Sequence, residues 1–119
     1  MKIEQKEKDG FYICTPFIRR LEVTNSDTFK TEMAKIIHKG CKFIILNLSK
    51  IDFMDSQGLA SLISVFKNLA KEGSLGLCAA TTNIQDLFTL TRMNRLFDLY
   101  NNEEEAIQRE LSKKELFDK

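Results

Sequence analysis

The sequence has little cysteine and almost no histidine. Cys14, Cys41 and Cys78 lie far apart, none of them belongs to a C-x-x-C pair, and His38 is the one histidine. A zinc site of the ordinary type needs four cysteine or histidine ligands at short spacings, so the sequence predicts no bound metal. Cys14 and Cys78 sit in apolar stretches, where free cysteine commonly serves as a small buried apolar residue. We expect that role for both cysteines, and we expect no cofactor.

The chain also lacks an excess of charge of either sign and a long apolar run. Its 18 Lys and Arg residues oppose 17 Asp and Glu residues, which leaves a net charge of +1 over 119 residues. Nucleic-acid-binding proteins usually carry a clear basic excess, so nucleic acid is not an expected partner. No apolar run approaches the roughly 20 residues that span a bilayer, and residues 1–4 do not resemble a signal peptide. These absences predict a cytoplasmic protein that does not insert into membranes.

Proline and glycine are scarce, with one and five residues, and no Ser/Gly-rich linker, repeat or low-complexity tract is present. An internal domain boundary is therefore not expected. Apolar residues make up 43% of the chain, which is sufficient for one core at this length. We predict a single domain over residues 1–119, with its core between about residues 11 and 110.

The first half of the chain predicts two strands, a helix and a third strand. Alternating charge over residues 2–9 indicates a short edge strand, and the aromatic and β-branched run 11–17 indicates a second strand. Cap-forming residues 24–27 precede a helix that Gly40 closes. The continuous apolar run 43–48 is typical of a strand that is covered on both faces, and such burial implies some parallel pairing.

The clearest pattern in the second half is an apolar stripe at helical spacing, which predicts a helix that Gly73 ends. The stripe consists of Leu59, Leu62, Ile63, Phe66, Leu69 and Ala70. Residues 75–80 then indicate another buried strand, and we expect Thr82 or Asn83 to cap a third helix.

A short strand over residues 96–100 and a last helix that begins at Glu103 complete the predicted elements. Ile107 and Leu111 are expected on the buried side of this helix. The order of these elements predicts an α/β domain with a mixed sheet of four to five strands and about four helices.

The segment between the most apolar strand and the most amphipathic helix, residues 51–59, carries the functional information. Ser56 falls where the helix begins, and a helix N-terminus favours a negatively charged group. A purely structural alternative is that Asp55 or Ser56 caps the helix while Gly58 allows tight packing against the strand. A capping box does not support that alternative, because Leu59 stands three residues after Ser56 where Glu or Gln would be needed.

In this context the sequence resembles a STAS domain of the anti-sigma factor antagonist family. The family pattern of a buried strand followed by Asp-Ser-x-Gly-Leu appears as LNLSKIDFMDSQGLASLI at residues 46–63. The similarity continues through residues 73–80 and 83–90 into Leu96 and Phe97, and covers most of the chain from residue 11 to about 107.

The resemblance implies a partner-switching regulator rather than an enzyme. In the family, a serine kinase that is also the anti-sigma factor phosphorylates the serine that corresponds to Ser56. The unphosphorylated protein holds this kinase and frees the sigma factor, the phosphorylated protein releases it, and a metal-dependent serine phosphatase resets the switch. We expect six further residues to form the partner-binding surround of the phosphoacceptor: Glu22, Asp52, Asp55, Gln57, Gly58 and Leu59.

A phosphate group would change the charge of this surface strongly. It adds about −1.5 to −2 charge on a small hydroxyl, next to Asp52, Asp55 and Glu22. We therefore expect phosphorylation to block the partner by local electrostatic and steric effects, with little refolding. The free protein is expected to be a monomer, because charges on its edge strand disfavour pairing with a second sheet.

Two positions depart from the family pattern. Gln57 follows the serine where the family often has a small residue, and Arg19 and Arg20 occupy a loop in which the family often has a turn glycine. Gln57 has two interpretations, a direct contact with the partner or a change in the choice of kinase, and for the two arginines one interpretation is a change in partner specificity. The arginines are also suited to a place near a phosphate, since Arg pairs well with it, although a solvated surface pair is the simpler interpretation.

Two other classes of function are weighed against the switch. For a hydrolase, the serine lacks a G-x-S-x-G elbow, and His38 is expected on the surface or in the packing of the first helix rather than as a base. Some domains that resemble this one are instead docking subunits of ABC-type lipid transport systems and work without phosphorylation. In either binding role, the predicted docking rim on the helix that follows Ser56 consists of Ser61, Ser64, Lys67 and Asn68.

Overall fold

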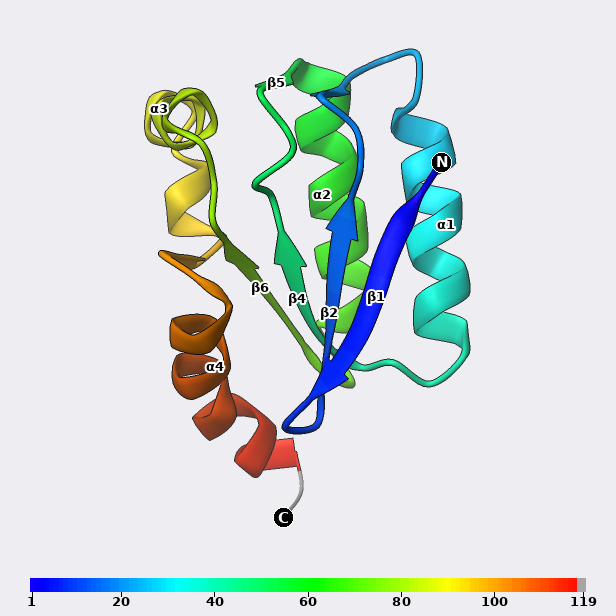
Figure 1. Cartoon of the computed structure of the whole chain (residues 1–119), viewed down its shortest axis with the longest axis vertical. Helices are drawn as coiled ribbons and strands as arrows, with labels where there is room; N and C mark the ends of the chain where they lie inside the picture. Colours follow the sequence, from blue (N-terminus) through cyan, green and yellow to red (C-terminus); the bar gives the residue numbers. More distant parts are fainter. Residues whose placement is uncertain (118–119) are drawn as a thin grey trace.

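Five strands form a mixed sheet at the centre of the protein in a computed structural model that describes residues 1–117 (Figure 1). In spatial order these strands are β1 (Ile3–Lys8), β2 (Phe11–Pro16), β4 (Phe43–Asn47), β6 (Ser74–Cys78) and β7 (Leu99–Tyr100). β1 pairs with β2 in antiparallel fashion, and every other neighbouring pair in this sheet is parallel. The α/β class and the mixed sheet of the sequence prediction are therefore confirmed.

Helices cover both faces of the sheet. They are α1 (Ser26–His38), α2 (Ser56–Leu69), α3 (Thr82–Leu90) and α4 (Glu103–Phe117), with a short 3₁₀ turn at Met93–Arg95. α1 and α2 lie side by side on one face, and α4 packs on β4, β6 and β7 (Figure 1). The four predicted helices are confirmed. His38 was expected either on the surface or in the packing of the first helix, and it is exposed at the end of α1.

The alternation of side chains along β4 explains why helices are needed on both faces. Successive residues of a strand point to opposite sides. Ile44 and Leu46 join a large apolar cluster with α1, α2 and α3, whereas Ile45 joins a smaller cluster with Ala106 and Ile107 of α4. The three cysteines are free and buried, as expected for Cys14 and Cys78.

A second, two-stranded sheet was not predicted from the sequence. It pairs β3 (Arg20–Leu21) with β5 (Phe53–Met54) in parallel. Two residues are too few to show an alternating pattern, so a strand of this length leaves no periodic signal in a sequence. This pairing brings the loop before α1 against the segment before α2, and thereby builds the site described below.

Three expectations about boundaries and burial were wrong. Thr81, not Thr82 or Asn83, caps α3, because its hydroxyl oxygen accepts a hydrogen bond from the Ile84 N–H at 3.4 Å. The strand expected over residues 96–100 is limited to β7, since Leu96 is the C-cap of the 3₁₀ turn. Ala70, placed in the apolar stripe of α2, is exposed just beyond the end of the helix.

The buried side of α4 also differs from the prediction. Leu111 is 41% exposed, while Glu110 is completely buried between α4 and the sheet. Glu110 Oε2 accepts a hydrogen bond from the Tyr100 hydroxyl at 2.7 Å and forms an ion pair with Lys113 at 2.9 Å. The sequence rule that charged residues stay outside the core fails here because two partners compensate the buried carboxylate.

Candidate functional site

Ser56 is the first residue of α2, and its side chain is exposed. The residue that caps the helix is Asp55, whose Oδ1 accepts a hydrogen bond from the Gly58 N–H at 2.9 Å. Asp55 has the extended backbone that is typical of a cap residue. Of the two capping residues that the sequence allowed, the structure therefore selects Asp55, and the Ser56 hydroxyl does not serve as the cap.

The second oxygen of Asp55 ties the loop before α1 to the start of α2. Asp55 Oδ2 accepts a hydrogen bond from the Val23 N–H at 3.0 Å, and the Asp55 N–H donates to the Leu21 carbonyl at 3.4 Å. These backbone donors favour the charged carboxylate, so the pKa of Asp55 lies below its ordinary value, with the Gly58 N–H as the largest cause. Asp55 is therefore ionised at neutral pH, next to Ser56.

Gly58 allows the close approach of α2 to β3. A Cβ atom at this position would overlap the carbonyl oxygen of Leu21, which is backbone and cannot move aside cheaply. The predicted tight packing of Gly58 is correct, but the strand that it contacts is β3, which the sequence did not reveal. Leu21 and Val23 were also missed as parts of the site, because both contribute backbone groups that no residue pattern signals.

Each arginine of the loop is paired with an acidic residue. Arg19 contacts Asp52 Oδ2 through Nη2 at 3.0 Å, and Arg20 Nε contacts Glu22 Oε2 at 3.0 Å. Two of the three acids expected to face a phosphate are thus neutralised locally, and Asp55 is the third. The Arg20 guanidinium also lies over the ring of Phe53, 4.1 Å from its centroid, which adds a contact between β3 and β5.

The remaining predicted residues differ in their access to a partner. Gln57 is exposed beside Ser56, and Leu59 is half-buried against the core. Ser61, expected on the docking rim, is buried and donates a hydrogen bond to the Gly58 carbonyl at 2.6 Å, so it is not available for docking. Of the other rim residues, Ser64 is half-buried, and Lys67 and Asn68 are exposed.

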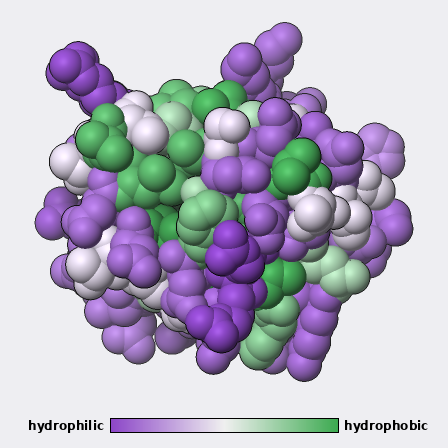
Figure 2. Space-filling model, turned by 90° about the horizontal axis from the view of Figure 1, so that it is seen from above, coloured by the Kyte–Doolittle hydropathy of each residue, from purple (hydrophilic) through white to green (hydrophobic). Residues whose placement is uncertain are grey.

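Apolar side chains are exposed at this end of the molecule. Phe17, Val23 and Phe53 have exposed fractions of 41%, 65% and 39%. Figure 2 views this end directly, and its largest green area lies toward the side of α3, with hydrophilic side chains around it. The surroundings of Ser56 therefore combine paired charges with exposed apolar surface.

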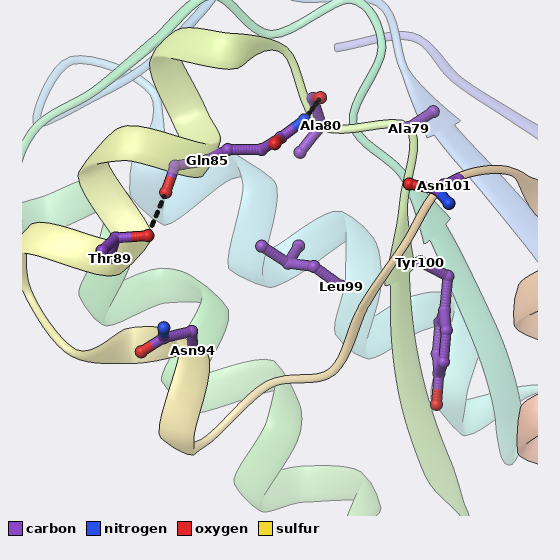
Figure 3. A pocket seen from close by; sticks show the side chains of 8 residues that line it. All are labelled: Ala79, Ala80, Gln85, Thr89, Asn94, Leu99, Tyr100 and Asn101. Carbon is purple, nitrogen blue, oxygen red and sulfur yellow. Dashed lines mark hydrogen bonds between the residues drawn. The ribbon is translucent and has the colours of Figure 1, made fainter.

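A hollow of about 240 Å³ lies between α3 and the segment that contains β7 (Figure 3). Gln85 Nε2 donates to the Ala80 carbonyl at 2.8 Å, and the Thr89 hydroxyl donates to the Gln85 carbonyl at 3.1 Å. The Tyr100 ring points away from α3 (Figure 3), and its hydroxyl contacts Glu110. Gln85 and Thr89 thus bond within α3 and the segment before it, Tyr100 bonds to α4, and Ser56 does not line this hollow.

Two searches of residues 1–117 bear on other kinds of site. No helix in this range is long and apolar enough to cross a membrane. The same range contains no group of three or more histidine, cysteine, aspartate or glutamate side chains placed to hold a metal ion.

Comparison with known proteins identifies a family and a set of related structures. The family model described as STAS domain matches residues 2–106. The anti-sigma F factor antagonist of Paenibacillus polymyxa is 27% identical over 109 residues, which are 90% of this chain and 92% of that protein.

Solved structures share the fold. An anti-sigma factor antagonist from Mycobacterium paratuberculosis superposes with a TM-score of 0.81 at 18% identity, over 92% of each chain. The anti-sigma factor antagonist SpoIIAA superposes with a TM-score of 0.71 in its unphosphorylated form, over 91% of this chain and 95% of that one. The phosphorylated form of Bacillus SpoIIAA superposes with a TM-score of 0.64, over 91% of this chain and 98% of that one. Each of the two SpoIIAA structures is 21% identical in sequence to this chain.

Proposed function

The chain belongs to the STAS domain family, and from this premise we propose that it is an anti-sigma factor antagonist controlled by phosphorylation of Ser56. In its unphosphorylated form it binds a serine kinase that is also an anti-sigma factor. Phosphorylation by that kinase ends the complex, and a metal-dependent serine phosphatase restores the binding form. The name of the Paenibacillus polymyxa relative and the two forms of SpoIIAA support this proposal.

One observation carries the proposal to a specific residue. The Ser56 side chain is exposed at the first position of α2, while Asp55 provides the cap of that helix. A serine that caps its helix uses its oxygen for the backbone, and modification would then cost stability. Because Asp55 caps α2, the Ser56 oxygen is not needed for the cap, and a kinase can modify it without weakening the start of the helix.

The expected effect of the phosphate is local. It brings about −1.5 to −2 charge beside Asp55, which is already ionised, and beside Glu22 and Asp52, which are already paired with arginines. A partner surface that fits the bare hydroxyl must then accommodate a bulky dianion and strip it of water. Loss of one central contact costs about 2 kcal/mol or more, a change of about 30-fold in affinity.

Phosphopeptide mass spectrometry on protein recovered from its native cells tests the site, with Ser56→Ala as the informative variant. Ser49, which is exposed and lies seven residues earlier, supplies the control variant Ser49→Ala. We expect phosphate on Ser56, no phosphate in Ser56→Ala, and unchanged modification in Ser49→Ala. A Ser56 that is never modified, even under stress, would contradict the proposal and leave a phosphorylation-independent docking subunit as the better interpretation.

Binding to the purified kinase tests the switch itself. Ser56→Asp introduces a charge at the modified position and is expected to bind the kinase at least 30-fold more weakly than the wild type. The local-blocking mechanism fails if this variant binds the kinase as tightly as the wild type.

A further inference from the structure

The hollow between α3 and β7 lies at a distinctive place in the topology. β6 and β7 pair in parallel, and the chain leaves each of them toward a different face of the sheet. After β6 it enters α3, which packs into the larger apolar cluster, and after β7 it enters α4, which packs into the smaller one. Two neighbouring parallel strands that continue into helices on opposite faces leave a crevice at their carboxyl ends, and ligands of α/β proteins commonly bind there.

Small side chains keep this crevice open. The chain after β6 places Ala79 and Ala80 at the hollow, and the Ala79 N–H donates to the Tyr100 carbonyl at 3.0 Å, which holds the carboxyl ends of the two strands together. The Leu99 side chain extends from β7 toward α3 and adds apolar surface (Figure 3). The volume of about 240 Å³ lies below the roughly 300–1,000 Å³ of sites for drug-sized ligands, so it suits a smaller molecule.

The polar groups of the hollow include three neutral hydrogen-bond acceptors. Gln85 Nε2 donates to the Ala80 carbonyl at 2.8 Å, which orients the amide and leaves Oε1 as an acceptor. Asn101 Nδ2 donates to Glu105 Oε2 at 3.2 Å, which orients the second amide and leaves Oδ1 as an acceptor. The Thr89 hydroxyl donates its proton to the Gln85 carbonyl at 3.1 Å, so its oxygen is the third acceptor.

These acceptors favour a ligand that donates several hydrogen bonds and carries no charge. Hydroxyl groups meet this requirement, because each of them has one proton to donate. In the part of the chain that the structure describes, the lining supplies neither a cation for an anionic ligand nor a carboxylate for an ammonium group. The apolar surface of Ala79, Ala80 and Leu99 suits the C–H groups of a sugar or a cyclic polyol.

We propose that this hollow binds a small neutral polyhydroxy compound, of the size of a monosaccharide, and that Gln85, Thr89 and Asn101 accept hydrogen bonds from its hydroxyl groups. The bound molecule joins α3 to the segment after β7, since its acceptors come from both. Ser56 does not line the hollow, so this proposal does not depend on the function proposed above.

Titration of the isotope-labelled full chain with D-glucose, D-ribose and myo-inositol, followed by heteronuclear NMR, tests the site. At least one of these compounds is expected to shift the amide signals of residues 79–80, 85–89 and 99–101 in a saturable way. A dissociation constant of about 1 mM is expected, as is typical for a ligand with about 12 non-hydrogen atoms. Glucosamine and gluconate, which carry opposite charges, are each expected to bind about tenfold more weakly than the best neutral compound.

Two variants remove different features of the hollow. Gln85→Leu keeps a side chain of similar size without the acceptor, and Thr89→Phe fills the space from an exposed position of α3. Each is expected to weaken binding about tenfold or more. The matched controls Asn83→Leu and Thr82→Phe change exposed residues of the same helix that do not line the hollow, and they are expected to bind within about twofold of the wild type. Thermal unfolding without ligand checks that all of these variants fold.

Three outcomes would overturn the proposal. The first is the absence of a saturable shift at the hollow with every neutral compound, up to about twenty times the expected dissociation constant. The second is binding to Gln85→Leu or Thr89→Phe as tight as to the wild type, because the compound would then bind elsewhere. The third is tighter binding of glucosamine or gluconate than of any neutral compound, which would contradict the chemical class of the ligand. The kinase experiments above do not enter these measurements, so the two proposals can fail separately.

Discussion

The two faces of the sheet are held in different ways. Under α1, α2 and α3 lies the larger apolar cluster, with fully buried side chains such as Phe29, Leu62 and Phe88. Under α4, the smaller cluster receives only Ala106 and Ile107 from the helix. The rest of that contact includes the ring of Phe117 against Phe43 and a polar group of side chains in which Glu110 is bound to Tyr100 and Lys113.

This difference places the candidate site on the more robust side of the molecule. α2, which carries Ser56, belongs to the face with the larger apolar cluster, where stability comes from burial and depends little on charge. The α4 face also contains one buried carboxylate with its partners, and such a contact is sensitive to the removal of a single group. In the function proposed above, the charge added at Ser56 would lie on α2 and not on the helix that carries this polar contact.

The largest effect is expected from Leu62→Ala, which removes a fully buried side chain from the α2 face. The free energy of unfolding, measured by urea denaturation, should fall by about 2–5 kcal/mol. Ala60, exposed on the same helix, supplies the control Ala60→Ser, with an expected change within about 0.5 kcal/mol. A loss below that of the α4 variant described next would reverse the ranking of the two faces.

A smaller loss, about 1–3 kcal/mol, is expected from Glu110→Ala, because the hydroxyl of the half-buried Tyr100 then lacks its acceptor. Glu110→Gln keeps the shape and an acceptor oxygen and should cost less. Glu104→Gln, at an exposed position of α4, is the control. Amide hydrogen exchange should place the faster exchange of Glu110→Ala in α4 and β7. Uniform acceleration over α1 and α2 would argue against a separate contribution of the two faces.

The rates at which Cys14 and Cys78 react with a thiol reagent compare the two faces of the sheet in the folded protein. Burial raises the pKa of Cys14 and of Cys78 to about 12, so both are unreactive thiols near neutral pH. Cys14 belongs to the larger cluster and Cys78 to the one under α4. Iodoacetamide should therefore modify Cys78 before Cys14, and Glu110→Ala should accelerate Cys78 alone, as mass spectrometry would show.

The same cysteines predict an alkaline limit of stability. Because folding raises their pKa, the stability that they contribute is fully present below the ordinary value of 9.0 and is lost as the pH rises toward 12. The wild type should lose stability over this range, and Cys14→Ala and Cys78→Ala should each lose less with pH. If the stability of the wild type, Cys14→Ala and Cys78→Ala fell equally with pH, the raised pKa of the two thiols would not be the cause of the alkaline loss.

At the Ser56 end, Asp55→Ala is expected to lower Tm by a few degrees, since it removes the cap of α2 and the bond to Val23. Folding lowers the pKa of Asp55, so its contribution is present above the ordinary value of 3.8 and disappears as the pH falls through the lowered pKa. The difference in Tm between the two proteins should therefore narrow in acid. A constant difference at all pH values would show that the charge is not involved.

The smallest effect is expected from Ser56→Ala, whose free energy of unfolding should stay within about 0.5 kcal/mol of the wild type. The side chain is exposed and Asp55 caps the helix in its place. A loss as large as that of Asp55→Ala would mean that Ser56 is itself needed for the start of α2.

The sequence by itself determined the parts of this protein that depend on local patterns. The apolar run of β4 and the stripe of α2 predicted their elements, because the side-chain periods of strands and helices are visible over five or more residues. The position of Ser56 at the start of α2 follows from the same patterns, and the Asp-Ser-x-Gly-Leu motif indicated the family. Those inferences needed no knowledge of contacts between distant residues.

Only the tertiary structure decided which residues far apart in the chain meet. Three contacts join segments about 30 residues apart: the pairing of β3 with β5, the ion pair of Arg19 with Asp52, and the hydrogen bond from Val23 to Asp55. The ion pair of Arg20 with Glu22 lies beside this junction. The burial of Glu110 likewise depends on the packing of α4 against β7, which brings the Tyr100 hydroxyl to its carboxylate. Such contacts depend on how whole elements pack, and a residue pattern within one segment carries no information about the partner that another segment supplies.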